Sequence, residues 1–158
     1  MKKIAVIGGG AAGMMASIFA ARRGMEVHVY EKNEKTGKKL YITGKGRCNL
    51  TNACDMEELL ESVKSNKKFL YSAFYGFTNQ DAYDFFEAEG LKLKVERGNR
   101  VFPLSDRSAD VLDTLRRAMR SAGVQVHLNT EVKSVRKQED GFTLQLADKT
   151  LEQADKVI

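Results

Sequence analysis

Tryptophan is absent from this 158-residue sequence, and proline occurs only once. The two cysteines, Cys48 and Cys54, are too few for a disulfide scaffold, and together with two histidines they exclude most zinc modules. A hydrophobic share of 42% and a charged share of 30% exclude a disordered, collagen-like or low-complexity chain. We therefore expect residues 1–158 to form one ordinary domain with a buried core.

Acidic residues are scarce in one segment of the chain. The net charge is +5, and residues 32–49 alone hold six basic residues against a single acidic one, Glu34. A nucleic-acid binder more often spreads its positive charge along a helix face. The concentration in one glycine-containing loop predicts a local anion site, with a merely solvated loop as the alternative, and it argues against a nucleic-acid partner.

A long uncharged run near the N-terminus is also interrupted. Residues 4–21 carry no charge, but three consecutive glycines at 8–10 divide them into a β-branched piece and a piece rich in alanine and methionine. A strand followed by a helix explains this run better than a signal peptide or a membrane span does. We therefore expect a cytoplasmic protein with no membrane partner.

The spacing of apolar residues predicts an α/β fold. Apolar strands at 2–7 and 26–30 flank a helix at 11–23, and such a β-α-β unit implies a parallel sheet. Residues 31–54 are expected to be a long loop, with room for one short helical turn. Further elements are predicted as helices at 56–64, 67–75 and 79–89, N-capped by Asp55 and Asn79, strands at 91–95 and 100–102, an amphipathic helix at 106–122, a strand at 124–128, an antiparallel meander of 131–137, 142–147 and 150–154, and the start of a strand at 155–158.

A dinucleotide-binding fingerprint lies between the first strand and the first helix. Residues 8–13 read GGGAAG and fit GxGxxG, and Glu31 ends the next strand, eighteen residues beyond Gly13. Gly8 permits the tight turn, Gly10 lets a pyrophosphate approach the backbone, and Gly13 lets helix and strand pack closely. The Glu31 carboxylate accepts hydrogen bonds from ribose hydroxyls and repels a 2′-phosphate, so NADP is not expected here. An empty glycine-rich turn is the alternative.

The order of the elements favours FAD over NAD at this site. In the simplest NAD-binding fold a second β-α-β unit follows at once, whereas here residues 31–123 intervene and a meander follows. This layout is that of a glutathione-reductase-like FAD/NAD(P)-binding Rossmann domain, a parallel sheet plus an antiparallel β-meander. Residues 55–105 would form a helical excursion between its strands.

Two further motifs give a more specific resemblance. Residues 37–40 (GKKL), 43–52 (TGKGRCNLTN) and 96–103 (ERGNRVFP) are similar to the BaiN-like, aminoacetone-oxidase-type family of NAD(P)/FAD-dependent oxidoreductases, over the whole chain. The resemblance implies a flavoprotein of about twice this length, so the chain is expected to be an N-terminal, C-terminally incomplete portion. Such a portion is not expected to be catalytically complete on its own.

What the resemblance implies for function is a flavin-dependent oxidoreductase, with hydride passing through flavin N5 to or from a small organic substrate. NADH or NADPH would be an electron donor bound away from the GxGxxG site. No catalytic residue is assigned, and no metal is expected. The FAD contacts carried over by the resemblance are Gly8, Gly10, Ala11, Ala12 and Gly13 in the turn, Glu31 and Lys32 at the ribose, Lys39, Leu40, Gly44, Gly46, Arg47, Cys48 and Asn49 towards pyrophosphate and flavin, and the Val132 backbone at adenine.

Two alternatives from other classes stay open. One is a truncated, non-catalytic fragment that binds FAD weakly or not at all. The other, less favoured, is a flavoprotein that docks RNA through its basic loop. An incomplete parallel sheet also predicts self-association through an exposed strand edge.

Several other residues are more typical of structure than of chemistry. Cys48 lacks a partner at CxxC spacing and is predicted to be a packed residue rather than a redox group. His28 and His127 alternate into strands and are predicted to be structural. The aromatics concentrated in residues 69–86 are predicted to pack a helical core, with a flavin or substrate wall as the alternative. Arg97 and Arg100 either steady an anionic substrate or pair with acids.

Overall fold

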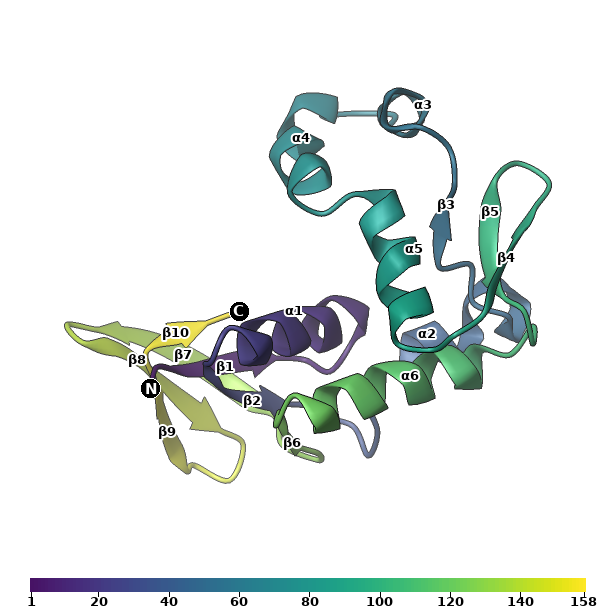
Figure 1. Cartoon of the computed structure of the whole chain (residues 1–158). Helices are drawn as coiled ribbons and strands as arrows, with labels where there is room; N and C mark the ends of the chain where they lie inside the picture. Colours follow the sequence, from purple (N-terminus) through teal and green to yellow (C-terminus); the bar gives the residue numbers. More distant parts are fainter. The chain divides into compact units, whose positions relative to one another are not determined.

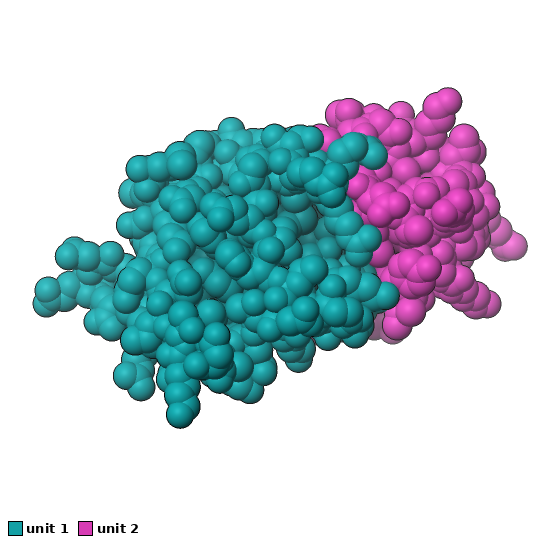
Figure 2. Space-filling model, turned by 90° about the horizontal axis from the view of Figure 1, so that it is seen from below, with its two compact units in different colours: residues 1–40, 115–158 teal, residues 41–114 magenta.

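A computed structural model describes residues 1–158, which divide into two compact units. The first unit consists of residues 1–40 and 115–158, and the second of residues 41–114 (Figure 2). The excursion predicted over 55–105 lies within the second unit. None of the helices has the length and apolar character needed to cross a membrane.

A parallel sheet is the centre of the first unit (Figure 1). Its strand order is β10-β1-β2-β6, and all three pairings are parallel. The helix α1, Ala11–Arg22, connects β1 to β2 as the β-α-β prediction required. The strands are β1 Lys3–Ile7, β2 Glu26–Tyr30, β6 Gln125–His127 and β10 Lys156–Val157.

Alternating residues divide the two faces of this sheet. Val6 faces α1, because its side chain lies beside the Gly13 backbone, and α1 buries Met14 and Ile18. The helix α6, Ser108–Ser121, buries the apolar side chains that its periodicity predicted: Val111, Leu112, Leu115, Ala118 and Met119. It begins two residues later than predicted, because Asp106 adopts a φ of +57° that no α-helix accommodates.

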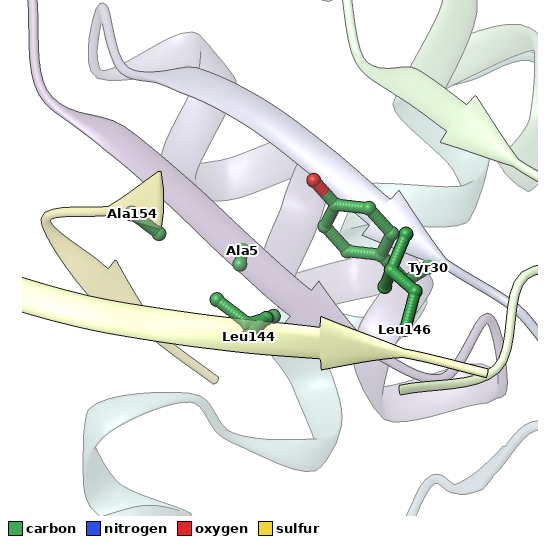
Figure 3. Close-up of a cluster of buried hydrophobic side chains, with 5 residues drawn as sticks. All are labelled: Ala5, Tyr30, Leu144, Leu146 and Ala154. Atoms are coloured by element: carbon green, nitrogen blue, oxygen red, sulfur yellow. The ribbon is translucent and has the colours of Figure 1, made fainter. Parts of the chain in front are cut away.

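The opposite face is covered by the antiparallel meander. It consists of β7 Val132–Gln138, β8 Gly141–Leu146 and β9 Leu151–Ala154, in the order β7-β8-β9. Figure 3 shows how β8 and β9 direct apolar side chains at Ala5 and Tyr30 of the sheet. The buried cluster is Ala5, Tyr30, Leu144, Leu146 and Ala154. The predicted layout of parallel sheet and meander is confirmed.

Two histidines contact each other on the meander side of the sheet. His28 Nδ1 and His127 Nε2 are 2.9 Å apart, and the two rings stack with centroids 5.2 Å apart. His127 also stacks on Tyr30 at 4.9 Å, and His28 Nε2 lies 3.0 Å from Glu26 Oε1. Burial, reinforced by the carboxylate of Glu152, raises the pKa of Tyr30 to about 12. In the His–His contact one ring nitrogen must accept, so at least one ring is neutral.

We expect the protein to lose stability as the pH falls through about 6.5, the ordinary pKa of a histidine. Burial, followed by the charge of His28, lowers the pKa of His127 from its ordinary value of 6.5. The unfolded chain therefore takes up this proton at a higher pH than the folded chain does, and the free energy of unfolding falls below about pH 6.5. His127→Gln, which keeps an acceptor for His28 but cannot titrate, should flatten this dependence in urea unfolding. An unchanged slope would show that His127 is not its source.

The second unit contains short helices and a small antiparallel sheet of order β3-β5-β4. Residues 31–54, predicted as a loop with one helical turn, contain more structure than that, including a strand that pairs with β5. Asp55 is the predicted N-cap and accepts from the Glu58 N–H. The elements are α2 Lys38–Ile42, which begins in the first unit, a 3-10 helix Thr43–Gly46, β3 Thr51–Asn52, α3 Met56–Glu61, α4 Lys67–Gly76, α5 Asn79–Ala88, β4 Leu93–Glu96 and β5 Arg100–Pro103.

The predicted N-cap of α5 is corrected by the structure. The N-cap of α5 is Thr78, which forms a capping box with Asp81, and not Asn79. The Asn79 amide instead donates to the carbonyls of Asn52 and Cys54, both at 2.7 Å. The Asn79 side chain therefore forms hydrogen bonds to residues distant in sequence and does not cap its own helix.

The predicted aromatic core is correct for α5 and wrong for α4. Phe85 and Phe86 are buried and meet edge to face. On α4, which buries no residue, Phe69 is 84% exposed and Tyr75 63%. Helical spacing groups aromatic residues on one face, but it does not determine whether another element covers that face.

Candidate cofactor-binding site

The glycine turn of the first unit presents an uncapped helix N-terminus. Gly8 has a φ of +100°, a conformation that glycine adopts without strain. Gly10 is the N-cap of α1, makes no side-chain capping bond, and is followed by a first turn without acidic residues. Gly10, Ala11 and Ala12 are exposed. The backbone N–H groups and the positive end of the helix dipole are thus available to an anion.

Side-chain volume at the turn matters in two opposite ways. A Cβ at Gly13 would collide with the carbonyl oxygen of Gly8, so helix and strand pack this closely only with glycine there. A Cβ at Gly10 would meet no protein atom within 4 Å. The space above Gly10 is open to a ligand, as the predicted role of this residue requires.

Glu31 lies beneath the turn as a buried carboxylate. Its Oε2 accepts from the Gly9 N–H at 2.7 Å, and its Oε1 accepts from the backbone N–H and Nδ2 of Asn33 at 2.8 and 2.6 Å. Burial acts to raise the pKa of Glu31, but the hydrogen bonds from Asn33 and Gly9 outweigh it and lower the pKa. The carboxylate is therefore ionised and retains capacity for a further donor such as a hydroxyl.

Backbone hydrogen bonds join one further segment to the turn and another to Glu31. The Gly37 N–H donates to the Gly9 carbonyl at 2.8 Å, and the Thr130 N–H donates to the Glu31 carbonyl at 2.9 Å. Val132 follows two residues later, half-buried at the start of β7 beside an irregularity in the β7–β8 register. The structure thus brings together the turn, Glu31 and the approach to Val132. Lys32 and Lys39 are exposed, and Leu40 is half-buried.

The remaining predicted residues form a tight loop in the second unit. Gly44 and Gly46 have φ values of +56° and +84°, and Lys45 and Cys48 also have positive φ. The Cys48 N–H donates to the Thr43 carbonyl at 3.1 Å, which closes the loop. The Cys48 side chain is buried, and burial raises the pKa of its thiol. Both cysteines are free thiols, and Asn49 is exposed.

Arg47 of this loop is held by two carboxylates. It donates to Glu96, and through Nε to Asp106 Oδ1 at 2.8 Å, while its guanidinium lies 4.2 Å from the centre of the Phe102 ring. Lys94 Nζ shares Asp106 at 2.6 Å. The hydrogen bonds that Arg47 donates to Glu96 and Asp106 raise its pKa. Its charge is engaged within the unit, and the predicted action of Arg47 on phosphate stays a prediction.

Sequence reasoning missed some members of both groups. Asn33, which orients Glu31, lies two residues after it, at the spacing typical of local hydrogen bonding by asparagine. Lys94 and Glu96 share one face of β4 by strand alternation, a signal that indicates a charged face but not its partner. Arg100 is exposed, and its Nε donates to the Arg97 carbonyl at 3.0 Å. This hydrogen bond is to a backbone carbonyl and not to a carboxylate.

The geometry fits a dinucleotide cofactor. Open space over Gly10, an uncapped helix N-terminus and an ionised carboxylate beside the turn match the pyrophosphate and ribose of such a molecule. No side chain fills the turn, since the positions that a Cβ would take at Gly8 and Gly10 lie in open space.

Comparison with known proteins gives relatives over most of the chain. The sequence is 34% identical over 160 residues to the 3-dehydro-bile acid delta(4,6)-reductase of Clostridium scindens, covering 100% of this chain and 38% of that protein. It is also 34% identical over 146 residues to the ribosomal RNA dihydrouridine synthase of Escherichia coli, covering 92% of this chain and 36% of that protein. The chain thus spans little more than a third of the length of these relatives.

Solved structures share the fold at low sequence identity. Thermovibrio ammonificans THI4 is 11% identical with a TM-score of 0.65, over 99% of this chain and 55% of that one. Glycine oxidase from Bacillus cereus is 14% identical with a TM-score of 0.57, over 99% and 54%. The model of the HI0933-like protein Rossmann domain matches residues 2–158. By this match, the chain belongs to the HI0933-like Rossmann-domain family.

Proposed function

We propose that this chain is the FAD-binding portion of a flavin-dependent oxidoreductase acting on a small organic substrate. The observation that carries the proposal is the open glycine turn at an uncapped helix N-terminus, with the ionised Glu31 beside it. Bound FAD supplies the redox chemistry, in which a hydride passes to or from the flavin N5. The protein residues supply binding, orientation and electrostatics.

Each part of the first unit has a role in this proposal. The N–H groups of Ala11, Ala12 and Gly13 bind the pyrophosphate, with Lys39 adding positive charge. Glu31 binds the adenosine ribose, Lys32 flanks it, and the Val132 backbone holds adenine.

The loop of the second unit is proposed to face the pyrophosphate and flavin. Gly44 and Gly46 permit close backbone approach, and Leu40, Cys48 and Asn49 complete the contact set. Arg47, fixed by Glu96 and Asp106, acts as a positioned charge for this loop. NADH or NADPH serves as the electron donor at a different site, because FAD occupies the glycine turn in this proposal, and the Glu31 carboxylate would in addition repel the 2′-phosphate of NADPH.

Retention of FAD is the first test of this function. The purified chain is mixed with FAD, desalted, and measured by absorbance spectroscopy. We expect flavin bands to remain at close to one flavin per chain, and ADP to compete with FAD because it carries the ribose and pyrophosphate. A 2′-phosphorylated ADP is the matched control and should compete poorly, because its extra phosphate faces Glu31. A folded chain without retained FAD would contradict the proposal and favour the non-catalytic fragment.

A second candidate is an RNA substrate. The observation that favours it is the 34% identity, over 92% of this chain, to a protein named ribosomal RNA dihydrouridine synthase. Against it stands the charge distribution, since the basic excess is concentrated in the proposed cofactor loop. RNA binding that persists after FAD saturation, and that weakens steeply with salt, would support RNA over a small molecule.

A further inference from the structure

Arg116 connects the helix α6 to the segment that follows Glu31. It lies in the part of α6 that belongs to the first unit, and it is half-buried. Its guanidinium donates twice to one residue, through Nη2 to the Thr36 carbonyl at 2.9 Å and through Nε to the Thr36 hydroxyl at 3.3 Å. Two hydrogen bonds from one planar group fix orientation as well as distance. Thr36 itself is buried, and water competes little with hydrogen bonds there.

Thr36 lies directly against the glycine turn. A Cβ at Gly9 would be 2.7 Å from the Thr36 methyl carbon, Cγ2, so this methyl group packs on the Gly9 backbone. The peptide group of the Thr36 carbonyl also carries the Gly37 N–H, which donates to the Gly9 carbonyl at 2.8 Å. The Gly9 carbonyl in turn belongs to the same peptide group as the Gly10 N–H. Two hydrogen-bonded peptide groups therefore lead from the Arg116 guanidinium to the N-cap of α1.

The hydrogen bonds along this path all run in one direction. At each step a donor binds a carbonyl whose own peptide N–H is the next donor, and hydrogen bonds aligned in this way polarise one another. Arg116 is a permanent cation at the first carbonyl, so it makes the last N–H of the path, that of Gly10, a stronger donor. The other peptide group of Gly9 is fixed separately, because its N–H donates to Glu31 Oε2 at 2.7 Å.

We propose that Arg116 is a positioning residue for binding of the cofactor pyrophosphate. It acts through Thr36 and Gly37, which hold the peptide group between Gly9 and Gly10 in place and strengthen its N–H as a donor. The inference rests on the proposed function, since it takes the turn to be the pyrophosphate site. Arg116 lies 80 residues from Thr36 in the sequence, so only the tertiary structure reveals the connection.

Substitution of Arg116 tests this role. Arg116→Met keeps an unbranched side chain but removes both hydrogen bonds. We expect FAD affinity to fall about tenfold, measured by titration at a temperature where circular dichroism shows that the chain is folded. Arg116→Lys should recover part of this loss, because an ammonium group can still donate to the Thr36 carbonyl. Arg120→Met is the matched control, since Arg120 lies one helical turn further on, is exposed and carries the same charge. It should bind FAD like the unaltered chain.

A second readout needs no cofactor. The NMR chemical shift of the Gly37 amide proton reports the strength of its hydrogen bond to Gly9. In the FAD-free chain, we expect Arg116→Met to move this resonance upfield and Arg120→Met to leave it in place. Thr36→Val removes only the hydroxyl acceptor, because valine keeps the methyl group against Gly9, and it should weaken FAD binding about threefold. In the Arg116→Met background it should add nothing, since the bond is already lost.

Three results would overturn the inference. Unchanged FAD affinity in folded Arg116→Met would mean that the turn does not need this support. Equal losses in Arg116→Met and Arg120→Met would mean a general effect of positive charge. An unmoved Gly37 resonance would mean that Arg116 does not act on this peptide group. Should Arg116→Met fail to fold, Thr36→Val decides, and unchanged FAD affinity there would also overturn the inference. A folded, unaltered chain that binds no FAD would instead contradict the proposed function itself.

Discussion

Replacing Gly10 by valine is expected to abolish FAD retention and to leave the fold almost unchanged. The backbone of Gly10 has φ −78° and ψ −175°, a conformation open to any residue, and a Cβ there meets no protein atom within 4 Å. The valine side chain would fill the space proposed for the pyrophosphate. We expect FAD affinity to fall at least about 100-fold, and the free energy of unfolding to change by no more than about 1 kcal/mol.

Gly13→Ala is the matched control, because this substitution is expected to destabilise the fold itself. Here the added Cβ collides with the Gly8 carbonyl oxygen, so the cost falls on the folded protein itself. A loss of about 3 kcal/mol is expected for such overpacking against backbone, which lowers the unfolding midpoint by about 10 °C. Thermal unfolding followed by circular dichroism, with FAD titration of each variant, separates the two effects. If Gly10→Val retained FAD, the site would not lie over this turn.

Glu31→Ala is expected to weaken both the fold and FAD binding. The substitution removes three hydrogen bonds and leaves the buried Gly9 N–H without its acceptor. We expect the free energy of unfolding to fall by roughly 2–4 kcal/mol at neutral pH. Because the pKa of Glu31 is lowered in the folded state, its contribution is full above the ordinary value of 4.5 and is lost as the pH falls below it.

Glu31→Gln provides the comparison that isolates charge. The amide keeps one acceptor oxygen, so it should retain more stability than alanine, but its NH₂ group faces a donor at Gly9 or Asn33. It should also bind the 2′-phosphorylated ADP relatively better than the unaltered chain, since the repelling charge is gone. Urea unfolding and competition titrations measure both. Equal stability of all three proteins would mean that the Glu31 contacts are not maintained in solution.

Local pattern was sufficient to predict the first unit. The prediction for strand β2 has the observed bounds, and the turn at 8–13 is recognisable because Gly8 and Gly13 have steric roles that other residues do not fill. The meander followed from strict alternation and its short connections. The conformation of such elements depends on a few residues that are neighbours in the sequence, and it can therefore be predicted from the sequence.

The second unit was predicted less well because its contacts are long-range. Asn79 is a good N-cap by type, yet its amide binds carbonyls near residues 52–54, a choice set by tertiary structure. The acids that hold Arg47 lie 49 and 59 residues away in sequence. The pairing of Arg47 leaves no periodic signal, and the helical spacing of the α4 aromatics does not show whether another element covers them. The sequence pattern therefore gives the character of a residue but not its partner.

The buried thiol of Cys48 can be used to measure how often the loop at residues 43–49 opens. Because the sulfur is buried and its pKa is raised, a thiol reagent reacts with it only in molecules whose loop has opened. In a Cys54→Ser variant, which removes the second, half-buried free thiol, the reaction rate compared with that of a small-molecule thiol then measures the free energy of this local opening. The measurement is then repeated with FAD present. A slower reaction of the Cys48 thiol would show that FAD binding protects this loop, which the flavin absorbance bands do not report.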